Sequence, residues 1–301
     1  MRRQTLVMAL VVLLITVTQA ARTQGEATPL CAEGEQAGVR FKVSLQKNVF
    51  VESEPIILTL TLTNTTDKET VLGELAYWTA SSSIVRKSGA EMPGGIELSM
   101  VQMPVDFGRV FRPGESYSLY RDISWRWSGM LPAEPYILKS EYHSDPDAVG
   151  NRRIQWKGRI VLPDLSFEIV PPRDAREKAA FELYRNTPYL TGDKASIYKA
   201  AIIMHGLSEP ALGGVFASSA GYREAEALRE AGDRPAYISA LRRYADKHKE
   251  EPYYYRQALT SLGDALCKDG NYAEARAVYA KLPDGYFTQG ILKDCDEHLP
   301  K

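Results

Sequence analysis

The stretch from Leu259 to Pro283 constrains the fold of this chain more than any other, because its residues predict two helices packed against each other. Apolar and small residues recur at helical spacing on both sides of a Gly270-Asn271 pair, which suits the end of one helix and the start of the next. A small residue such as Gly263 lets two antiparallel helices approach closely. The stretch therefore predicts a helical hairpin, which is not in itself an activity.

This hairpin resembles the tetratricopeptide repeat. The residues at the characteristic positions of that repeat are Leu262, Gly263, Leu266, Gly270, Tyr272, Ala275 and Tyr279. The resemblance implies an α-helical, repeat-like domain of tetratricopeptide-like hairpins over residues 173–301. Independently, helical periodicity begins after Arg173, and Asp174 and Asp193 suit helix N-caps. Only one repeat is convincing, so a generic domain of α-helical hairpins is the alternative.

The N-terminus has the pattern of a secretory signal peptide. Arg2 and Arg3 precede an uncharged apolar run over residues 6–17, and small or polar residues follow up to Ala20. The run is shorter than the roughly 20 residues that a spanning helix needs. We therefore expect residues 1–20 to be removed, and the mature chain to be secreted or periplasmic without a membrane span. A retained signal anchor is the alternative.

The charge balance argues against nucleic acid as a partner. Removal of Arg2 and Arg3 with the signal peptide changes the formal charge from −1 to −3, and no polybasic tract is present. A protein that binds nucleic acid or an anionic membrane surface normally presents a basic patch. We therefore expect a protein or peptide partner that is chosen by shape; the oligomeric state stays open.

Composition divides the mature chain at Pro171-Pro172. The segment before this pair is rich in Val, Ile, Thr and Ser, whereas the segment after it is rich in Ala, Glu, Arg and Leu. We expect a flexible leader over residues 21–37, a β domain over residues 38–172 and an α-helical domain over residues 173–301. Each domain is long enough to bury a core of its own.

Alternating apolar and polar residues over 39–45 and 56–63 predict half-buried strands, and the later strand patterns favour an all-β, antiparallel sandwich. The domain resembles bacterial secreted immunoglobulin-like domains. The resemblance rests on Glu54-Pro55-Ile56, Leu60-Thr61-Leu62-Thr63-Asn64, Pro113-Gly114-Glu115 and Trp156-Lys157-Gly158. Ser53 departs from the pattern, because glycine usually precedes the Glu-Pro pair. The resemblance implies an immunoglobulin-like fold but assigns no binding residue.

Two aromatic groups are candidate binding residues. Tyr253, Tyr254 and Arg256 begin the first helix of the hairpin, and tyrosine is favoured in binding surfaces. Trp125 and Trp127 could form an exposed aromatic platform for a sugar or peptide. In both groups the alternative is packing within the protein. The successive residues Tyr253, Tyr254 and Tyr255 cannot all face one way on a helix.

The sequence lacks recognised catalytic and metal-binding motifs. Its histidines are scattered, and no zinc, nucleotide or nucleophile-elbow motif is present, so we expect no cofactor and no metal site. The expected function is non-enzymatic protein or peptide binding, with the helical domain as the interaction surface. The alternatives are a proteinase-inhibitor-like module that acts through sandwich loops, and an envelope enzyme with a cryptic site.

The cysteines predict one disulfide. An exported chain meets an oxidising compartment, in which paired cysteines form bridges. If successive helices keep equivalent positions, Cys267 and Cys295 come close together. We therefore predict a Cys267–Cys295 disulfide, with Cys31 free or intermolecular. Two thiols that never meet are the alternative.

Overall fold

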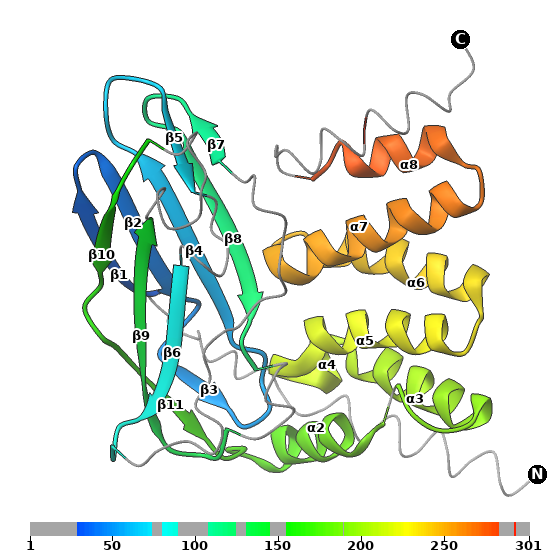
Figure 1. Cartoon of the computed structure of the whole chain (residues 1–301). Coiled ribbons are helices and arrows are strands. Elements are labelled where there is room, and N and C mark those ends of the chain that lie inside the picture. The colour runs from blue at the N-terminus through cyan, green and yellow to red at the C-terminus, as the bar shows by residue number, and fades with distance from the viewer. Residues whose placement is uncertain are drawn as a thin grey trace, which may run out of the picture.

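The computed structural model describes residues 29–73, 80–89, 108–124, 131–144, 155–188, 190–282 and residue 292. Strands occupy the N-terminal part of these residues and helices the C-terminal part, and the two parts lie side by side (Figure 1). The predicted order, antiparallel sheets followed by helices, is confirmed. Within the described ranges no single helix is long and apolar enough to cross a membrane. One bent pair of helical segments, Lys194–Leu207 with Pro210–Glu230, has the length and composition of a membrane span, by those two criteria alone.

The described residues of the β region form three sheets. One has the order β1-β2-β4-β8, a second has the order β10-β9-β11-β3 with β6 also paired to β9, and β5 pairs with β7. Strand pairing is antiparallel except between β11 and β3. The strands are β1 Leu30–Gln36, β2 Val39–Leu45, β3 Val49–Val51, β4 Ile57–Asn64, β5 Thr70–Gly73, β6 Ala80–Arg86, β7 Gly108–Phe111, β8 Ser116–Asp122, β9 Pro135–Ser144, β10 Gly158–Val161 and β11 Leu165–Val170.

Tyr142 of β9 links the three sheets. Its ring packs against Phe41 of β2 at a centroid distance of 5.6 Å and stacks on Trp156 at 5.3 Å. Its hydroxyl donates a hydrogen bond to the Gly73 carbonyl of β5 at 2.9 Å. Tyr142 is fully buried, and the inward-facing residues of both larger sheets belong to one hydrophobic cluster. The alternation seen in the sequence therefore marks the side of each strand that faces this cluster.

The β structure begins earlier than the sequence predicts. Residues 30–36 lie within the expected leader, but they form β1, which pairs residue for residue with β2. The strand was missed because it has little apolar alternation: Ala32 is its only hydrophobic residue in the core. Gly34 faces the Ile160 and Leu162 side chains so closely that an added Cβ atom would lie 2.9 Å from Ile160. A strand with such close neighbours needs small residues, which resemble a linker in the sequence.

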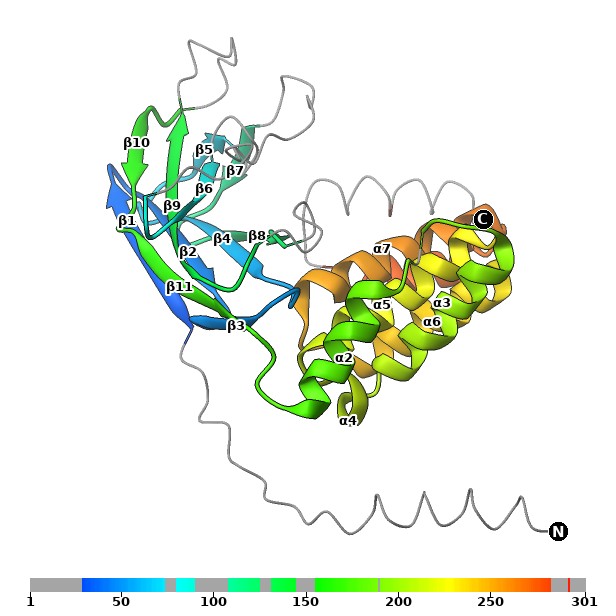
Figure 2. The same cartoon turned by 90° about the horizontal axis from the view of Figure 1, so that it is seen from below.

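The helices of the helical region are stacked in a row, and the last four run in alternating directions (Figures 1 and 2). The predicted N-caps are confirmed: Asp174 accepts a hydrogen bond from the Glu177 amide at 2.8 Å, and Asp193 accepts one from the Ser196 amide at 2.7 Å. The helices are α2 Ala175–Asn186, α3 Lys194–Leu207, α4 Pro210–Gly213, η2 Gly214–Phe216, α5 Ala217–Glu230, α6 Arg234–Lys247, α7 Pro252–Lys268 and α8 Tyr272–Tyr279.

Two helical hairpins share one turn geometry. The predicted hairpin is α7 and α8, and its turn contains Gly270 with φ 74°. The pair α5 and α6 has the same turn, with Gly232 at φ 72°. In each turn the residue after the glycine donates its amide to a helix carbonyl five residues earlier, Asp233 to Leu228 at 3.0 Å and Asn271 to Leu266 at 2.9 Å. This is the hydrogen bond of a Schellman-type helix end.

The β region and the helical region pack on each other. Ile57 of β4 belongs to the hydrophobic cluster of α5 to α8, and Val51 of β3 belongs to the cluster of α2, α3 and η2. Both side chains are almost fully buried, at 2% and 3% exposed. The two regions therefore share buried apolar surface, although strands end at Val170 and helices begin at Ala175.

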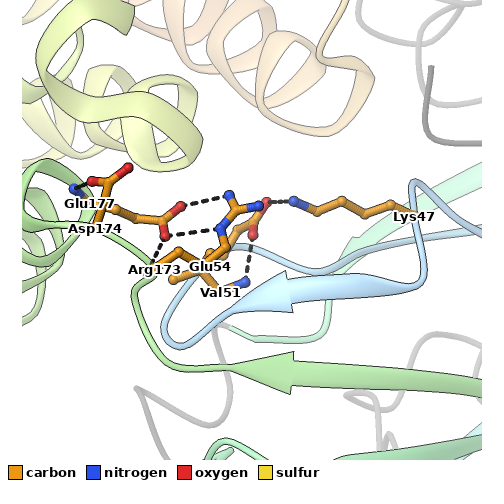
Figure 3. Close-up of polar contacts among 6 residues, drawn as sticks. All are labelled: Lys47, Val51, Glu54, Arg173, Asp174 and Glu177. Atoms are coloured by element: carbon orange, nitrogen blue, oxygen red, sulfur yellow. Dashed lines mark hydrogen bonds and ion pairs between the residues drawn. The ribbon is translucent and has the colours of Figure 1, made fainter. Parts of the chain in front are cut away.

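Polar contacts lie on each side of this junction, as Figure 3 shows. Buried Glu54 accepts a hydrogen bond from the Val51 amide at 2.8 Å and forms an ion pair with Lys47 at 2.6 Å. On the helical side Arg173 pairs with Glu177 at 2.8 Å. Burial raises the pKa of Glu54, and the nearby Lys47 ammonium opposes that shift.

Candidate functional site

An open groove of about 370 Å³ lies between the α5–α6 turn and the C-terminal half of α7. We call it the α6–α7 groove, and it is lined by Arg229, Gly232, Arg234, Tyr237, Ser261, Asp264, Ala265 and Lys268. The N-terminal end of α7 contacts β8, so the groove lies toward the end of the helical region that points away from the sheets (Figure 1).

The glycine turn places two arginines at one wall of the groove. Gly232 takes a left-handed conformation, which glycine adopts without steric cost, and lets α6 begin directly after α5 ends. Arg229 lies in the last turn of α5 and Arg234 in the first turn of α6. The two guanidinium groups thus flank the turn.

Helix α7 supplies the opposite wall. Ser261, Asp264, Ala265 and Lys268 have spacings of three, four and seven residues, which place them on one face of a helix. Asp264 accepts a hydrogen bond from the Tyr279 hydroxyl, which ties the groove wall to α8. Among the residues that the structure describes, Lys268 has no ion-pair partner.

The arginines are paired, but they remain more exposed than their partners. Arg229 contacts Glu226 at 2.6 Å, with 54% of the arginine side chain exposed and 14% of the glutamate. Arg234 contacts Asp269 at 2.6 Å, with exposures of 41% and 33%. The Arg229 side chain is therefore far more exposed than its carboxylate partner, whereas the Arg234 Nε atom is buried and its Nη2 atom donates a hydrogen bond to the Ala265 carbonyl.

Tyrosine hydroxyls form the polar floor of this part of the helical region. Tyr237 is 7% exposed, and its hydroxyl is hydrogen-bonded to Ser261, which is also hydrogen-bonded to Tyr222. Burial raises the pKa of Tyr237, so its hydroxyl stays protonated at neutral pH. Such a floor offers neutral hydrogen-bonding groups beside the exposed cations.

The predicted residue Tyr254 does not lie on an open surface. It is 7% exposed, and its hydroxyl donates a hydrogen bond to Asp122, at the end of β8. Burial and the Asp122 carboxyl group raise the pKa of Tyr254 well above its ordinary value. Tyr254 therefore serves as a contact between the β region and the helical region.

The other predicted binding residues are not brought to the groove. Tyr253 is half-buried and packs edge-on against Tyr254, at a centroid distance of 4.9 Å. Arg256 is half-buried on the same helix, and its carbonyl accepts a hydrogen bond from the Thr260 hydroxyl. Trp125 and Trp127 lie outside the described residues. A binding role for Tyr253, Arg256, Trp125 or Trp127 remains a prediction.

The groove residues were missed by sequence reasoning, although one signal for them was present. Ala227-Leu228 precedes Gly232-Asp233 at the same spacing as Ala265-Leu266 precedes Gly270-Asn271. This correspondence would have predicted a second hairpin and a turn at Gly232. It would not have shown that α7 packs beside that turn.

The predicted disulfide cannot be placed, because Cys295 lies outside the described residues. Cys31 and Cys267 are not in a disulfide in the part of the chain that the structure describes. Over the same residues no three His, Cys, Asp or Glu side chains gather as metal ligands would. No protein-family model matches the sequence, and no curated protein matches it significantly.

Proposed function

We propose that this chain is an extracytoplasmic, non-enzymatic protein that binds another protein or peptide through the α6–α7 groove. The observation that carries the proposal is the groove itself. It combines exposed cations, buried neutral hydroxyls and an aromatic ring on a firmly packed pair of helices. Tyrosine and arginine are enriched in protein interfaces, because they bury much area and offer directed hydrogen bonds.

We further propose that the β region is an immunoglobulin-like sandwich and that the helical region consists of tetratricopeptide-like hairpins. The shared core of the two larger sheets supports the first reading. The equivalent turns at Gly232 and Gly270 support the second, although their separation of 38 residues exceeds the repeat's usual length of about 34. In this arrangement the β region packs against the start of α7 and leaves the opposite end of α7, where the groove lies, accessible.

The proposed location rests on the signal-peptide pattern of residues 1–20. Cell fractionation tests it: mature protein that begins near Ala21 in the periplasm or medium supports the proposal. A full-length chain that stays in the cytoplasm would contradict it.

The binding proposal is tested by capture from an envelope extract. Wild-type protein is compared with Lys268→Glu, which reverses a groove charge, and with Lys249→Glu, a matched change at an exposed residue beyond the other end of α6. Circular dichroism checks that both variants are folded. We expect the wild type and Lys249→Glu to capture the same protein and Lys268→Glu to lose most of it. Equal capture by all three chains would exclude the groove as the binding site.

A further inference from the structure

Strand β8 forms one edge of the sheet β1-β2-β4-β8, because among the described strands it pairs with β4 alone. An antiparallel ladder uses the backbone N–H and C=O groups of every second residue. At one end of the β4–β8 ladder the Asn64 amide donates to the Glu115 carbonyl at 3.0 Å. At the other end the Ile123 amide donates to the Ile56 carbonyl at 2.9 Å. The odd-numbered residues of β8 therefore bond to β4, and the backbone groups of the even-numbered residues point away from it.

These outward backbone groups are occupied at one end of β8 and unpaired further along the strand. The Tyr253 hydroxyl of α7 accepts a hydrogen bond from the Asp122 amide. Within the described part of the chain, no hydrogen bond is found for the outward backbone groups of Ser118 and Tyr120. Both residues are only half-buried. An unpaired strand edge of this kind is a template on which another extended chain can pair.

The place of β8 in the molecule indicates what can pair with it. It is the strand of its sheet that lies nearest the helices, and α7 contacts it (Figures 1 and 2). A second copy of the protein that paired edge to edge would extend its sheet toward the space that the helical region occupies. A single extended chain lies only about 5 Å from the strand with which it pairs. The edge therefore suits one peptide strand rather than a second copy.

The side chains of β8 indicate the sequence pattern of such a strand. On one face of the sheet the Ser118 hydroxyl is hydrogen-bonded to the Thr61 hydroxyl at 2.9 Å. The Ser116 and Thr63 hydroxyls form an equivalent pair at 2.8 Å. On the other face Leu119 is only partly buried against the β core. Ser or Thr on an added strand would extend the row of hydroxyls, and Val, Ile or Leu on its other face would cover Leu119.

We propose that β8 binds an extended segment of a partner polypeptide, which joins the sheet as a fifth strand and alternates hydroxyl with aliphatic side chains. Main-chain hydrogen bonds to Ser118 and Tyr120 hold this segment, and Tyr253 marks the end of the available edge. The site goes beyond the proposed function and does not depend on it, because the α6–α7 groove lies at the other end of α7.

Amide hydrogen exchange of the whole mature chain tests this proposal with a short synthetic peptide that alternates Thr and Val between terminal Lys residues. At saturation we expect the exchange of the Ser118 and Tyr120 amides to slow about tenfold or more, because both gain acceptors. Two control peptides are methylated on the backbone nitrogens of either all Thr or all Val residues. Only one of these sets of amides can face β8, so we expect one methylated peptide to slow exchange and the other to have no effect.

Substitutions at position 118 supply the second readout. Ser118→Pro removes an outward N–H group without removing a bond to β4, and an edge strand tolerates proline at such a position. Ser118→Ala is the matched control, because it loses the same hydroxyl and keeps the N–H group. Circular dichroism checks that both variants are folded. We expect the proline variant to bind the unmethylated peptide about tenfold more weakly and the alanine variant about two- to threefold more weakly.

Several results would overturn the proposal. Equal slowing by both methylated peptides would show that main-chain pairing is not the mode of binding, and no slowing by any peptide would show that the edge does not accept a strand. Ser118 and Tyr120 amides that are protected in the free protein would also contradict it. Protection that is independent of protein concentration would mean that another part of the chain covers the edge, and protection that grows with concentration would mean that a second copy does.

Discussion

The Tyr254 hydroxyl donates a hydrogen bond to the Asp122 carboxyl group, and this bond joins the first turn of α7 to the end of β8. Both residues are buried, at 7% and 9% exposed. The other Asp122 oxygen accepts hydrogen bonds from the Ser124 amide and hydroxyl. The carboxyl group is thus satisfied only while the helical region stays packed on the sheets, which couples the two regions.

Removal of the Tyr254 hydroxyl should weaken this coupling. Tyr254→Phe leaves one buried Asp122 oxygen without its donor, so we expect the free energy of unfolding to fall by about 1–3 kcal/mol. Urea denaturation measures the change. Tyr255→Phe is the control, because the Tyr255 ring is half-buried and no hydrogen bond of its hydroxyl is found among the described residues. A loss equal to that of the control would mean that the bond contributes nothing to stability.

The same pair shows where sequence reasoning stops. Helical periodicity correctly requires that successive tyrosines of α7 face different ways. It cannot say which neighbour each one meets, because Asp122 lies 132 residues away in the sequence. Tyr254 therefore looked like a binding residue although it is an internal contact.

Local features were predicted well. The caps at Asp174 and Asp193 and the alternation of β2 and β4 depend on residues within one turn or one strand, and the structure contains them. The groove is lined by Arg229 of α5 and Lys268 of α7, which belong to different helices. Features that depend on contacts between helices or strands could not be predicted from the sequence patterns.

The backbone conformation of Ser53 explains why glycine is usual at this position of the Gly-Glu-Pro pattern. Its φ of 65° lies in the left-handed region, which costs a residue with a Cβ atom about 1–2 kcal/mol. Its Oγ atom is also buried without a hydrogen-bond partner. We expect Ser53→Gly to raise the free energy of unfolding by about 0.5–1 kcal/mol, after the entropy cost of glycine. Ser53→Ala keeps the strain, so an equal gain from alanine would attribute the effect to the hydroxyl instead.

Two glycines in helices should respond in opposite ways to alanine. A Cβ atom on Gly263 would lie 2.3 Å from the Tyr279 ring, which is buried and held by Asp264, so we expect a loss of about 1–3 kcal/mol or more. Gly206 in α3 has no atom within 4 Å of such a Cβ, and Gly206→Ala should stabilise by about 0.5–1 kcal/mol. Thermal unfolding of the two variants measures both. A neutral result at Gly263 would contradict the close approach of α7 and α8.

Glu251 should make stability depend on pH. Burial, and then the nearby Glu54 carboxylate, raise its pKa above the ordinary value of 4.5. The folded chain therefore binds this proton more tightly than the unfolded chain, and Glu251's contribution to stability falls as the pH rises above about 4.5. Glu251→Gln should become more stabilising relative to the wild type between pH 4 and pH 7. A difference that stays constant over this range in urea titrations would exclude the raised pKa.

Cys267 and Leu292 pack on the same hydrophobic cluster, which is compatible with the predicted disulfide. Both residues are partly buried against this cluster of the helical region. Cys295 follows Leu292 by three positions, so their Cα atoms lie within about 11 Å of each other in any conformation. A disulfide requires the Cα atoms of Cys267 and Cys295 to lie about 4.4–6.8 Å apart.

We expect protein recovered from an oxidising compartment to contain the Cys267–Cys295 bridge, which should add about 3–4 kcal/mol by restricting the unfolded chain. Non-reducing peptide mapping identifies the linked peptides, and urea denaturation with and without reductant measures the contribution. Cys31→Ser is the control, because Cys31 is exposed on β1 and its removal should change neither the bridge nor the midpoint. Recovery of Cys267 and Cys295 as separately alkylated thiols would rule out the bridge and the helix register from which it was predicted.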